Sequence, residues 1–238
     1  MITFVYSYFK NKNMFQLQQK NWNNYSEEIK KQVEVIITDD CSPDNDCISN
    51  AVIEQIYPNM RLFKIKEKVP WNWLECRNIG AFHAKGDWIL LTDMDHLVPE
   101  STIEYVIAKI NKLEKNIVYQ FERIRAVDNK SYHFHNDTFF ISKKLFWNCG
   151  GYDEHYSGLY GTSGAFRRRL LKKANGNVRF SVPLVLYGRE VIFDASTNPN
   201  ECKRKEGRNP NEMQLRHKLK PKKEVHFKYP YEEININA

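Results

Sequence analysis

The segment DWILLTDMDHLVP, residues 87–99, guides the interpretation of the rest of the chain. Its first part, Trp88 to Leu91, is a short apolar run typical of a buried strand. The run ends in two carboxylates one residue apart, Asp93 and Asp95, with His96 directly behind them. Because a cation removes the repulsion between two such acids, and oxygen ligands hold Mg²⁺ or Mn²⁺, we expect a divalent-cation site at this strand end.

Strand and helix patterns alternate on both sides of this segment. Near-continuous apolar runs such as VEVIIT, residues 33–38, are typical of strands buried on both faces of a parallel sheet. The expected strands are 2–8, 33–38, 61–65, 88–91, 117–121 and 138–142, with one or two more in 178–187. The expected helices are 14–25, 47–57, 74–84, 165–174, and one that opens with a capping box at 101–104 and runs to about 115. The alternation predicts an α/β fold with a mostly parallel central sheet flanked by helices.

Composition limits the class of protein. With 238 residues, 42% of them hydrophobic, the chain can bury the core of one domain, with or without an appended tail. No window approaches the ~18 uninterrupted apolar residues of a membrane span. The N-terminus has no basic segment or small-residue cleavage site, so we expect a first strand there, not a signal peptide, and a cytosolic protein. The five cysteines lack paired spacing, which argues against a disulfide framework and a zinc site.

The net charge of +7 is uneven, with much of the excess in FRRRLLKK, residues 166–173, and in 203–228. Such clusters can bind nucleic acid, an anionic membrane or a phosphate-bearing ligand, although most are solvated surface. No zinc-finger, RRM or KH signature accompanies them, so we expect no specific nucleic-acid partner. From residue 197 onward, Asn, Pro, Lys and Arg dominate, which predicts a segment that either folds over a ligand or is partly disordered.

A second acidic loop, TDDCSPD at 38–44, follows the strand at 33–38. Alone, this loop or the one at 93–96 would be interpreted as a turn. Ligands of open α/β sheets bind outside the carboxyl ends of the strands, so two acidic loops at such ends predict one shared site.

Three blocks carry a family resemblance: VEVIITDDCSPD (33–44), RNIGAFHAKGDWILLTDMDHLVP (77–99) and GGYDEHYSGLYGTSGAFRRRL (150–170). Their order and spacing resemble the nucleotide-sugar-dependent glycosyltransferases of family 2, which have the GT-A fold, from the first strand to about Lys173. The resemblance implies one GT-A domain over residues 1–196, with a nucleotide-sugar-binding half (1–100) and an acceptor half (101–196). The basic segment 197–238 would then be a flexible loop that closes over the donor.

The resemblance also implies the residues that bind the nucleotide. Asp39 or Asp40 would accept a hydrogen bond from N3–H of uracil, and Ser7 and Tyr8 would line the base. Arg77 would reach the base or the phosphates with its planar, always-charged guanidinium.

By the same resemblance, the two acids of the Asp-x-Asp motif have separate roles. Asp93 would hold the ribose hydroxyls, or the metal through water. Asp95 would ligate the Mn²⁺ or Mg²⁺ that bridges the donor phosphates and neutralises the leaving diphosphate. His96 could be a further ligand, but neighbouring side chains on an extended segment alternate in direction.

The general base departs from the family pattern. Where family members place a catalytic carboxylate, this chain has Ser163, whose hydroxyl has too high a pKa to act as a base near neutrality. Three alternatives follow: Asp153 or Glu154 is the base, the usual acid has been replaced, or the protein binds donor and transfers poorly. The GTSG stretch around Ser163 can also simply cap the next helix.

The basic segment offers further ligands by resemblance. His217 or His226 could bind the metal, while three cationic residues could clamp the diphosphate: Arg204, Lys205 and Arg208.

Together these features predict a metal-dependent, inverting glycosyltransferase. It would transfer a sugar from a nucleoside-diphosphate sugar, with UDP-sugar as the expected donor, to a hydroxyl of a glycan or other acceptor. The alternatives are a non-catalytic nucleotide-sugar or glycan-binding module, favoured by Ser163, and a nucleotidyltransferase. The latter should have a Gly-rich loop after the first strand, and YSYFKNKNMF, residues 6–15, lacks glycine.

Overall fold

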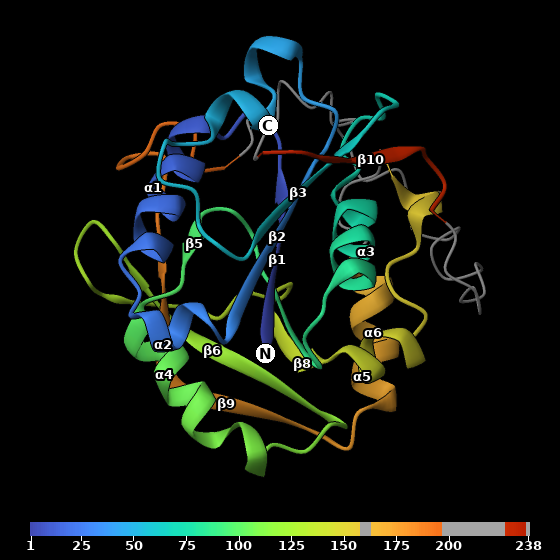
Figure 1. The fold of residues 1–238 in the computed structure, drawn as a ribbon. Helices are drawn as coiled ribbons and strands as arrows, with labels where there is room; N and C mark the ends of the chain where they lie inside the picture. Colours follow the sequence, from blue (N-terminus) through green and yellow to red (C-terminus); the bar gives the residue numbers. More distant parts are fainter. Residues whose placement is uncertain (158–162, 197–226, 237–238) are drawn as a thin grey trace.

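The computed structural model describes residues 1–157, 163–196 and 227–236. These residues form one ten-stranded mixed sheet with helices on both faces (Figure 1). The strand order is β10-β3-β2-β1-β4-β8-β6-β9-β5, and β7 pairs with β6 outside this path.

The strands are β1 (Ile2–Tyr8), β2 (Val33–Asp39), β3 (Met60–Ile65), β4 (Trp88–Leu91), β5 (His96–Leu97), β6 (Ile117–Arg125), β7 (Ser131–Tyr132), β8 (Phe139–Ser142), β9 (Gly176–Leu186) and β10 (Tyr231–Ile234). The α-helices are α1 (Lys12–Asn23), α2 (Glu27–Lys30), α3 (Trp73–His83), α4 (Glu100–Lys109), α5 (Lys143–Asn148) and α6 (Ser163–Lys173). Short 3-10 turns are η1 (Asp44–Asp46), η2 (Ile48–Ala51), η3 (Ile110–Lys112) and η4 (Glu154–Tyr156).

The N-terminal half of the sheet is parallel, as predicted. Strand β1 pairs in parallel with β2 on one side and with β4 on the other, and β2 pairs in parallel with β3. The chain therefore returns past β1 between β3 and β4, which makes the carboxyl ends of β1 and β4 a topological switch point. In open α/β sheets, this is where ligands bind.

The C-terminal half of the sheet is mixed. Strand β8 runs antiparallel to β4 and to β6, whereas β6 and β9 are parallel over a long pairing with one irregularity. The α/β prediction is confirmed, but the sheet is mixed and not mostly parallel, because β8 joins β4 and β6 through antiparallel pairs. Strand β6 extends to Arg125, beyond the expected end at 121, and this extension carries Arg123 toward the switch point.

The core lies in two layers, one on each face of the sheet. Helices α1, α2 and α4 cover one face, and α3, α5 and α6 cover the other (Figure 1). Helix α3 lies so close to β1 that a Cβ on Gly80 would be 2.4 Å from Cγ1 of Val5. A glycine at this position therefore sets how closely the helix that carries Arg77 approaches the sheet.

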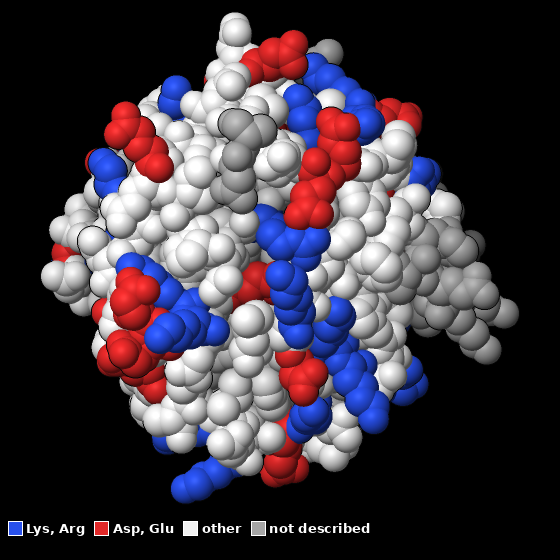
Figure 2. Space-filling view, in the orientation of Figure 1, with Lys and Arg blue, Asp and Glu red and all other residues white. Residues whose placement is uncertain are grey.

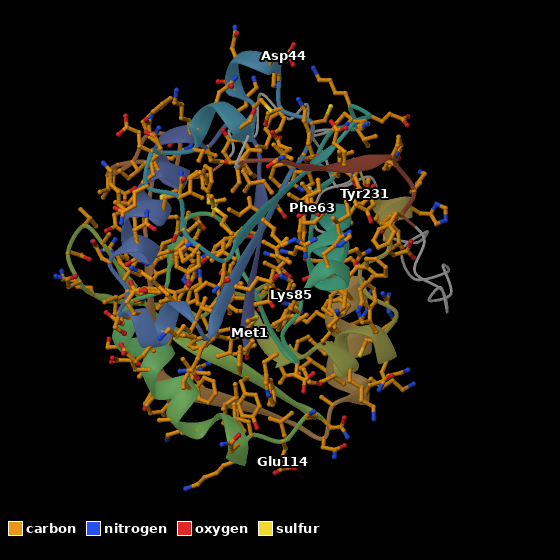
Figure 3. All side chains as sticks on the ribbon, viewed as in Figure 1. Met1, Asp44, Phe63, Lys85, Glu114 and Tyr231 are labelled. Carbon is orange, nitrogen blue, oxygen red and sulfur yellow. The ribbon has the colours of Figure 1, made fainter. Side chains whose placement is uncertain are left out.

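Residues 227–236 pack against the edge of the sheet. Strand β10 pairs antiparallel with β3, and the Tyr231 ring lies against Phe63, which Figure 3 shows side by side. The carboxylate of Glu233 accepts two hydrogen bonds from Arg61, at 2.7 and 2.9 Å. Part of the segment assigned from sequence to a separate tail is thus a strand of the main sheet, while 197–226 lie outside the described residues.

Two sequence predictions of helices are wrong. Residues 47–57 do not form a helix: η2 ends at Ala51, and Val52 is already extended. The reason is the Asp39 carboxylate, which accepts the backbone N–H groups of Ser42 and Ile48 and fixes the segment as a compact loop. Such side-chain hydrogen bonds compete with the helical pattern of backbone bonds.

The predicted capping box at 101–104 is also wrong. Helix α4 begins at Glu100 after Pro99, with no side-chain cap, and its α-helical part ends at Lys109. The hydroxyl of Thr102 donates to the carbonyl of Pro183, and the Glu100 carboxylate accepts from the backbone N–H of Ser26. Pro99, not Ser101, stands at the N-cap, so Ser101 already lies in the first turn of the helix and the local pattern placed the start of α4 too late.

On the face drawn in Figure 2, Lys and Arg side chains lie interspersed with Asp and Glu. Within the described ranges, no helix is long and apolar enough to cross a bilayer. The cytosolic location expected from the sequence stays a prediction.

Candidate active site

The loop after β4 presents Asp93 and Asp95 at the switch point. Helix α1 holds this loop in place, because the Gln18 amide donates to the carbonyls of Met94 and His96 at 2.9 and 2.8 Å. The Asp93 side chain keeps 45% of its surface exposed, whereas that of Asp95 keeps 18%. Asp93 is therefore the more accessible of the two acids to a ligand.

Arg77 of α3 reaches across to this loop. Its side chain is fully buried, and its Nη2 donates to Oδ1 of Asp93 at 2.5 Å. Its Nη1 donates to the Asp137 carbonyl at 2.6 Å and to the Tyr152 hydroxyl at 3.0 Å. The guanidinium also lies 4.7 Å from the centre of the Trp73 ring. These contacts hold the cation in one orientation beside the acidic loop.

The contacts between Arg77, Asp93 and their neighbours shift the pKa values of both side chains. Burial alone would raise the pKa of Asp93, but the positive potential of Arg77, with His135 and His96, outweighs it and holds the pKa below its ordinary value. Burial opposes the charge on Arg77, yet Tyr152 and Asp93 more than compensate and raise its pKa. Asp93 is therefore an anion at neutral pH, with one oxygen committed to Arg77.

The other oxygen of Asp93 faces a histidine. Nε2 of His135 lies 3.4 Å from Oδ2 of Asp93, and Nδ1 of the same ring lies 2.9 Å from Oγ1 of Thr138. Burial lowers the pKa of His135, with Asp93 opposing it. Among the described residues, one group of side chains has potential metal-ligand atoms all within 4.8 Å of one another: Asp93, His96 and His135.

His96 is held by a second buried arginine. Its Nε2 lies 2.8 Å from Nη1 of Arg123, while the other guanidinium nitrogens donate to the carbonyl of His133. Because a guanidinium only donates, Nε2 of His96 must accept, and the ring proton of the neutral imidazole is on Nδ1. That Nδ1 lies 3.0 Å from Oδ1 of Asp95. Both atoms are buried; the contact between them lacks the alignment of a hydrogen bond, and neither forms one elsewhere within the described part of the chain.

At the end of β2, the two acids differ. Both oxygens of Asp39 accept backbone N–H groups, from Ser42 at 2.8 Å and from Ile48 at 2.9 Å. Asp40 accepts one, from Asn72 at 2.8 Å, through Oδ2, and its Oδ1 is buried with no partner in the described residues. Burial raises the pKa of Asp40 to about 8.

The two residues expected to line the base, Ser7 and Tyr8, face opposite sides of β1. Ser7 donates to the carbonyl of Trp73, next to Asn72, at 3.3 Å. Tyr8 is fully buried, and its hydroxyl donates to the carbonyl of Asp46 at 2.9 Å. Ser7 thus lies on the α3 side of the sheet, and the Tyr8 ring packs in the core layer on the α1 side.

The candidate bases lie around α3 and α6. Both oxygens of Glu154 accept hydrogen bonds, from the Asn78 amide at 2.8 Å and from the backbone N–H of Lys228 at 2.7 Å. Asp153 accepts from the backbone N–H of His155. Ser163 begins α6, one turn before Phe166, whose ring packs 4.3 Å from that of Tyr152.

Five residues expected at the site lie outside the described part of the chain: His217, His226, Arg204, Lys205 and Arg208. Sequence reasoning missed Asn72, Arg123, His135, Asp137 and Tyr152. The polar run HFHND, residues 133–137, directly before an apolar strand, was the available signal for His135.

The fold, with carboxylates at the switch point of a half-parallel mixed sheet, defines the GT-A class of transferase. The sequence model of Glycosyl transferase family 2 matches residues 19–174, more than half of the chain. The chain therefore belongs to glycosyltransferase family 2. This confirms the resemblance stated from the three sequence blocks.

Similar proteins agree with this assignment. An "uncharacterized glycosyltransferase" of Haemophilus influenzae is 32% identical over 104 residues, which are 43% of this chain and 33% of that protein. S. aureus TarS 1–349, in complex with UDP-GlcNAc, matches with a TM-score of 0.64 at 14% identity, over 83% of this chain and 61% of its own. The mannosyltransferase PcManGT of Pyrobaculum calidifontis, in complex with GDP-Man and Mn²⁺, matches with a TM-score of 0.58 at 12% identity, over 77% and 56%.

At such identities, the two structures show a shared fold. The chain spans a third of the length of the curated relative, and under two thirds of each of the two structures. These similarities therefore do not identify the donor, the metal or the acceptor of this chain.

Proposed function

We propose that this chain transfers a sugar from a nucleoside-diphosphate sugar to an acceptor hydroxyl, in a metal-dependent, inverting reaction. The observation that carries the proposal is the way α3 links the ends of β2 and β4. At its N-terminus, Asn72 donates its backbone N–H to Asp40, and one turn later Arg77 donates to Asp93. The helix thus connects a buried carboxylate oxygen, which a nucleobase requires as an acceptor, to the Arg77–Asp93 pair, whose charges a diphosphate and its cation require.

The nucleobase would lie beside Asp40. Once the carboxyl is ionised, its unpartnered Oδ1 can accept the N3–H of uracil, whereas both oxygens of Asp39 are committed to the loop. Of the two acids that the sequence left open, we therefore favour Asp40. A uridine donor agrees with the UDP-GlcNAc bound by TarS, although the GDP-Man bound by PcManGT illustrates that the fold accepts other donors.

The diphosphate would lie over the loop after β4. The residues there fit an Mn²⁺ or Mg²⁺ ion, because Arg77 holds only Oδ1 of Asp93, which leaves Oδ2 for a cation, and the Asp95 side chain keeps 18% of its surface exposed. When bound, such an ion neutralises charge on the leaving diphosphate. Arg77 holds Asp93 in place and supplies a further fixed positive charge.

The acceptor base is the weakest part of the catalytic arrangement. Glu154 uses both oxygens to hold Asn78 and Lys228, so we favour a structural role for it. The Ser163 hydroxyl is too weak a base to take a proton from the acceptor near neutrality. This observation favours a second candidate function, a module that binds the nucleotide sugar and transfers it slowly.

Thermal shift measurements with UDP, GDP, TDP and CDP sugars, each with and without Mn²⁺, test the donor and the metal. A ligand that binds only the folded protein raises its melting temperature. We expect the largest rise with a UDP-sugar and Mn²⁺, and loss of the Mn²⁺ effect in Asp95→Ala. Equal shifts with UDP and CDP would contradict the Asp40 assignment, because cytosine has no N3–H.

Donor hydrolysis and transfer by three variants test the base. If Ser163 occupies the position of the usual acid, Ser163→Asp should raise turnover by about 10²- to 10⁴-fold with little change in donor affinity. If Asp153 or Glu154 is the base, Asp153→Asn or Glu154→Gln should instead abolish turnover. If none of the three substitutions changes the turnover rate and donor binding stays intact, the chain is a nucleotide-sugar-binding module.

A further inference from the structure

We propose that His135, from the connection between β7 and β8, is a ligand of the divalent cation together with Asp93. The inference rests on the proposed function and adds a nitrogen ligand from outside the Asp-x-Asp loop. It assigns a role to a side chain that no sequence motif marked.

The spacing of the two ligand atoms fits one ion. Nε2 of His135 and Oδ2 of Asp93 are 3.4 Å apart, longer than a usual N–H···O hydrogen bond. Two ligands of one Mn²⁺ or Mg²⁺ ion, each about 2.1 Å away, are about 3.0 Å apart when adjacent and about 4.2 Å apart when opposite. The pair falls between these limits, so only small movements are needed to coordinate an ion.

The remaining contacts of each side chain leave these two atoms available. Asp93 uses its other oxygen for Arg77, which anchors the carboxylate. His135 uses its other nitrogen, Nδ1, for Thr138, whose hydroxyl lies 3.0 Å from that of Thr92. A ligating histidine typically donates its second N–H in this way, because that bond fixes the tautomer with the free lone pair toward the metal.

His96 does not compete for this role. Its Nε2 accepts from Arg123, and its Nδ1 therefore carries the proton and faces Asp95. Its ring packs against that of His135 with the ring centres 4.9 Å apart. His96 thus supports the His135 ring, and His135 is the imidazole of the group that can offer a lone pair.

Pulsed electron paramagnetic resonance of bound Mn²⁺ tests the inference directly. The Mn²⁺ complex of the unmodified protein, formed with UDP present, should show ¹⁴N coupling from a coordinated imidazole. His135→Ala should lose this coupling and bind Mn²⁺ at least 10-fold more weakly, a figure of the order seen when a group supporting a ligand is lost. His133→Ala, which removes an exposed imidazole two residues earlier in the same loop, is the matched control and should keep both.

A second variant tests the hydrogen bond that orients the ring. Thr138→Val keeps the shape of the side chain and removes its oxygen, so Mn²⁺ affinity should fall about 10- to 100-fold while the ¹⁴N coupling of the saturated complex remains. UDP affinity without metal and the melting temperature report whether each variant is folded.

The outcomes separate the two proposals. Mn²⁺ that binds without ¹⁴N coupling, or coupling that persists in His135→Ala, would overturn the His135 assignment and leave the glycosyltransferase proposal standing. No Mn²⁺ binding with UDP present would overturn the metal dependence and, with it, this inference.

Discussion

The buried carboxylate of Asp40 should make the folded protein less stable as the pH rises. In the folded state, burial raises the pKa of Asp40 to about 8, whereas an exposed aspartate titrates near 4. Because the folded state retains this proton more tightly than the unfolded state, the stabilising contribution is complete below the unfolded pKa. It is lost as the pH rises toward the folded pKa.

The structure sets the magnitude of this effect. Only the backbone N–H of Asn72 offsets the burial, since Oδ1 of Asp40 has no partner in the described residues. Each pH unit between the two pKa values is worth about 1.4 kcal/mol, so the free energy of unfolding should fall by up to about 4 kcal/mol from pH 5 to pH 8 through this group. Asp40→Asn keeps an oxygen for the Asn72 N–H and carries no titrating group, so it should remove this fall.

Urea denaturation at pH 5, 6, 7 and 8, followed by tryptophan fluorescence, measures the effect as the difference between variant and unmodified protein. Other titrating groups cancel in that difference. Asp44→Asn, at a fully exposed carboxylate, is the control and should leave the pH dependence unchanged. If the curves of Asp40→Asn and the unmodified protein run parallel from pH 5 to pH 8, the argument from burial is refuted.

Three further variants test how the site is supported. Gly80→Ala should lower the free energy of unfolding by about 1–3 kcal/mol, because the new Cβ would meet Val5 at 2.4 Å. Gly164→Ala, whose Cβ would meet, among the described residues, the end of the Arg168 side chain at 3.7 Å, should be neutral or stabilise by up to ~1 kcal/mol, and equal losses would contradict the packing argument. Glu154→Ala should cost about 1.5–3 kcal/mol in urea denaturation, because it leaves a buried amide and the Lys228 N–H without their charged acceptor, and an unchanged stability would return Glu154 to the candidate bases.

The sequence by itself determined the order of the elements in the parallel half and the acids at its strand ends. Strands β1, β2 and β4 and helix α3 lie within one or two residues of their predicted bounds. Their patterns are local, since a run of apolar side chains or a turn of helix is visible within about ten residues. The rule that ligands bind at carboxyl ends then picked out the acidic loops 38–44 and 93–96 as candidate site segments without any coordinates.

Only the tertiary structure decided which side chains lie together at the candidate site. The choice between Asp39 and Asp40 depends on which backbone N–H groups fold back onto each carboxylate, and the same contacts replaced the predicted helix at 47–57. Arg123 and His135 reach the Asp93 loop through β6 and the connection that precedes β8, which approach the loop only once distant strands have paired. Long-range pairing leaves no periodic trace in the sequence, because it joins segments whose local patterns are independent of each other. The side chains that surround the motif, unlike the motif itself, therefore became visible only in the folded chain.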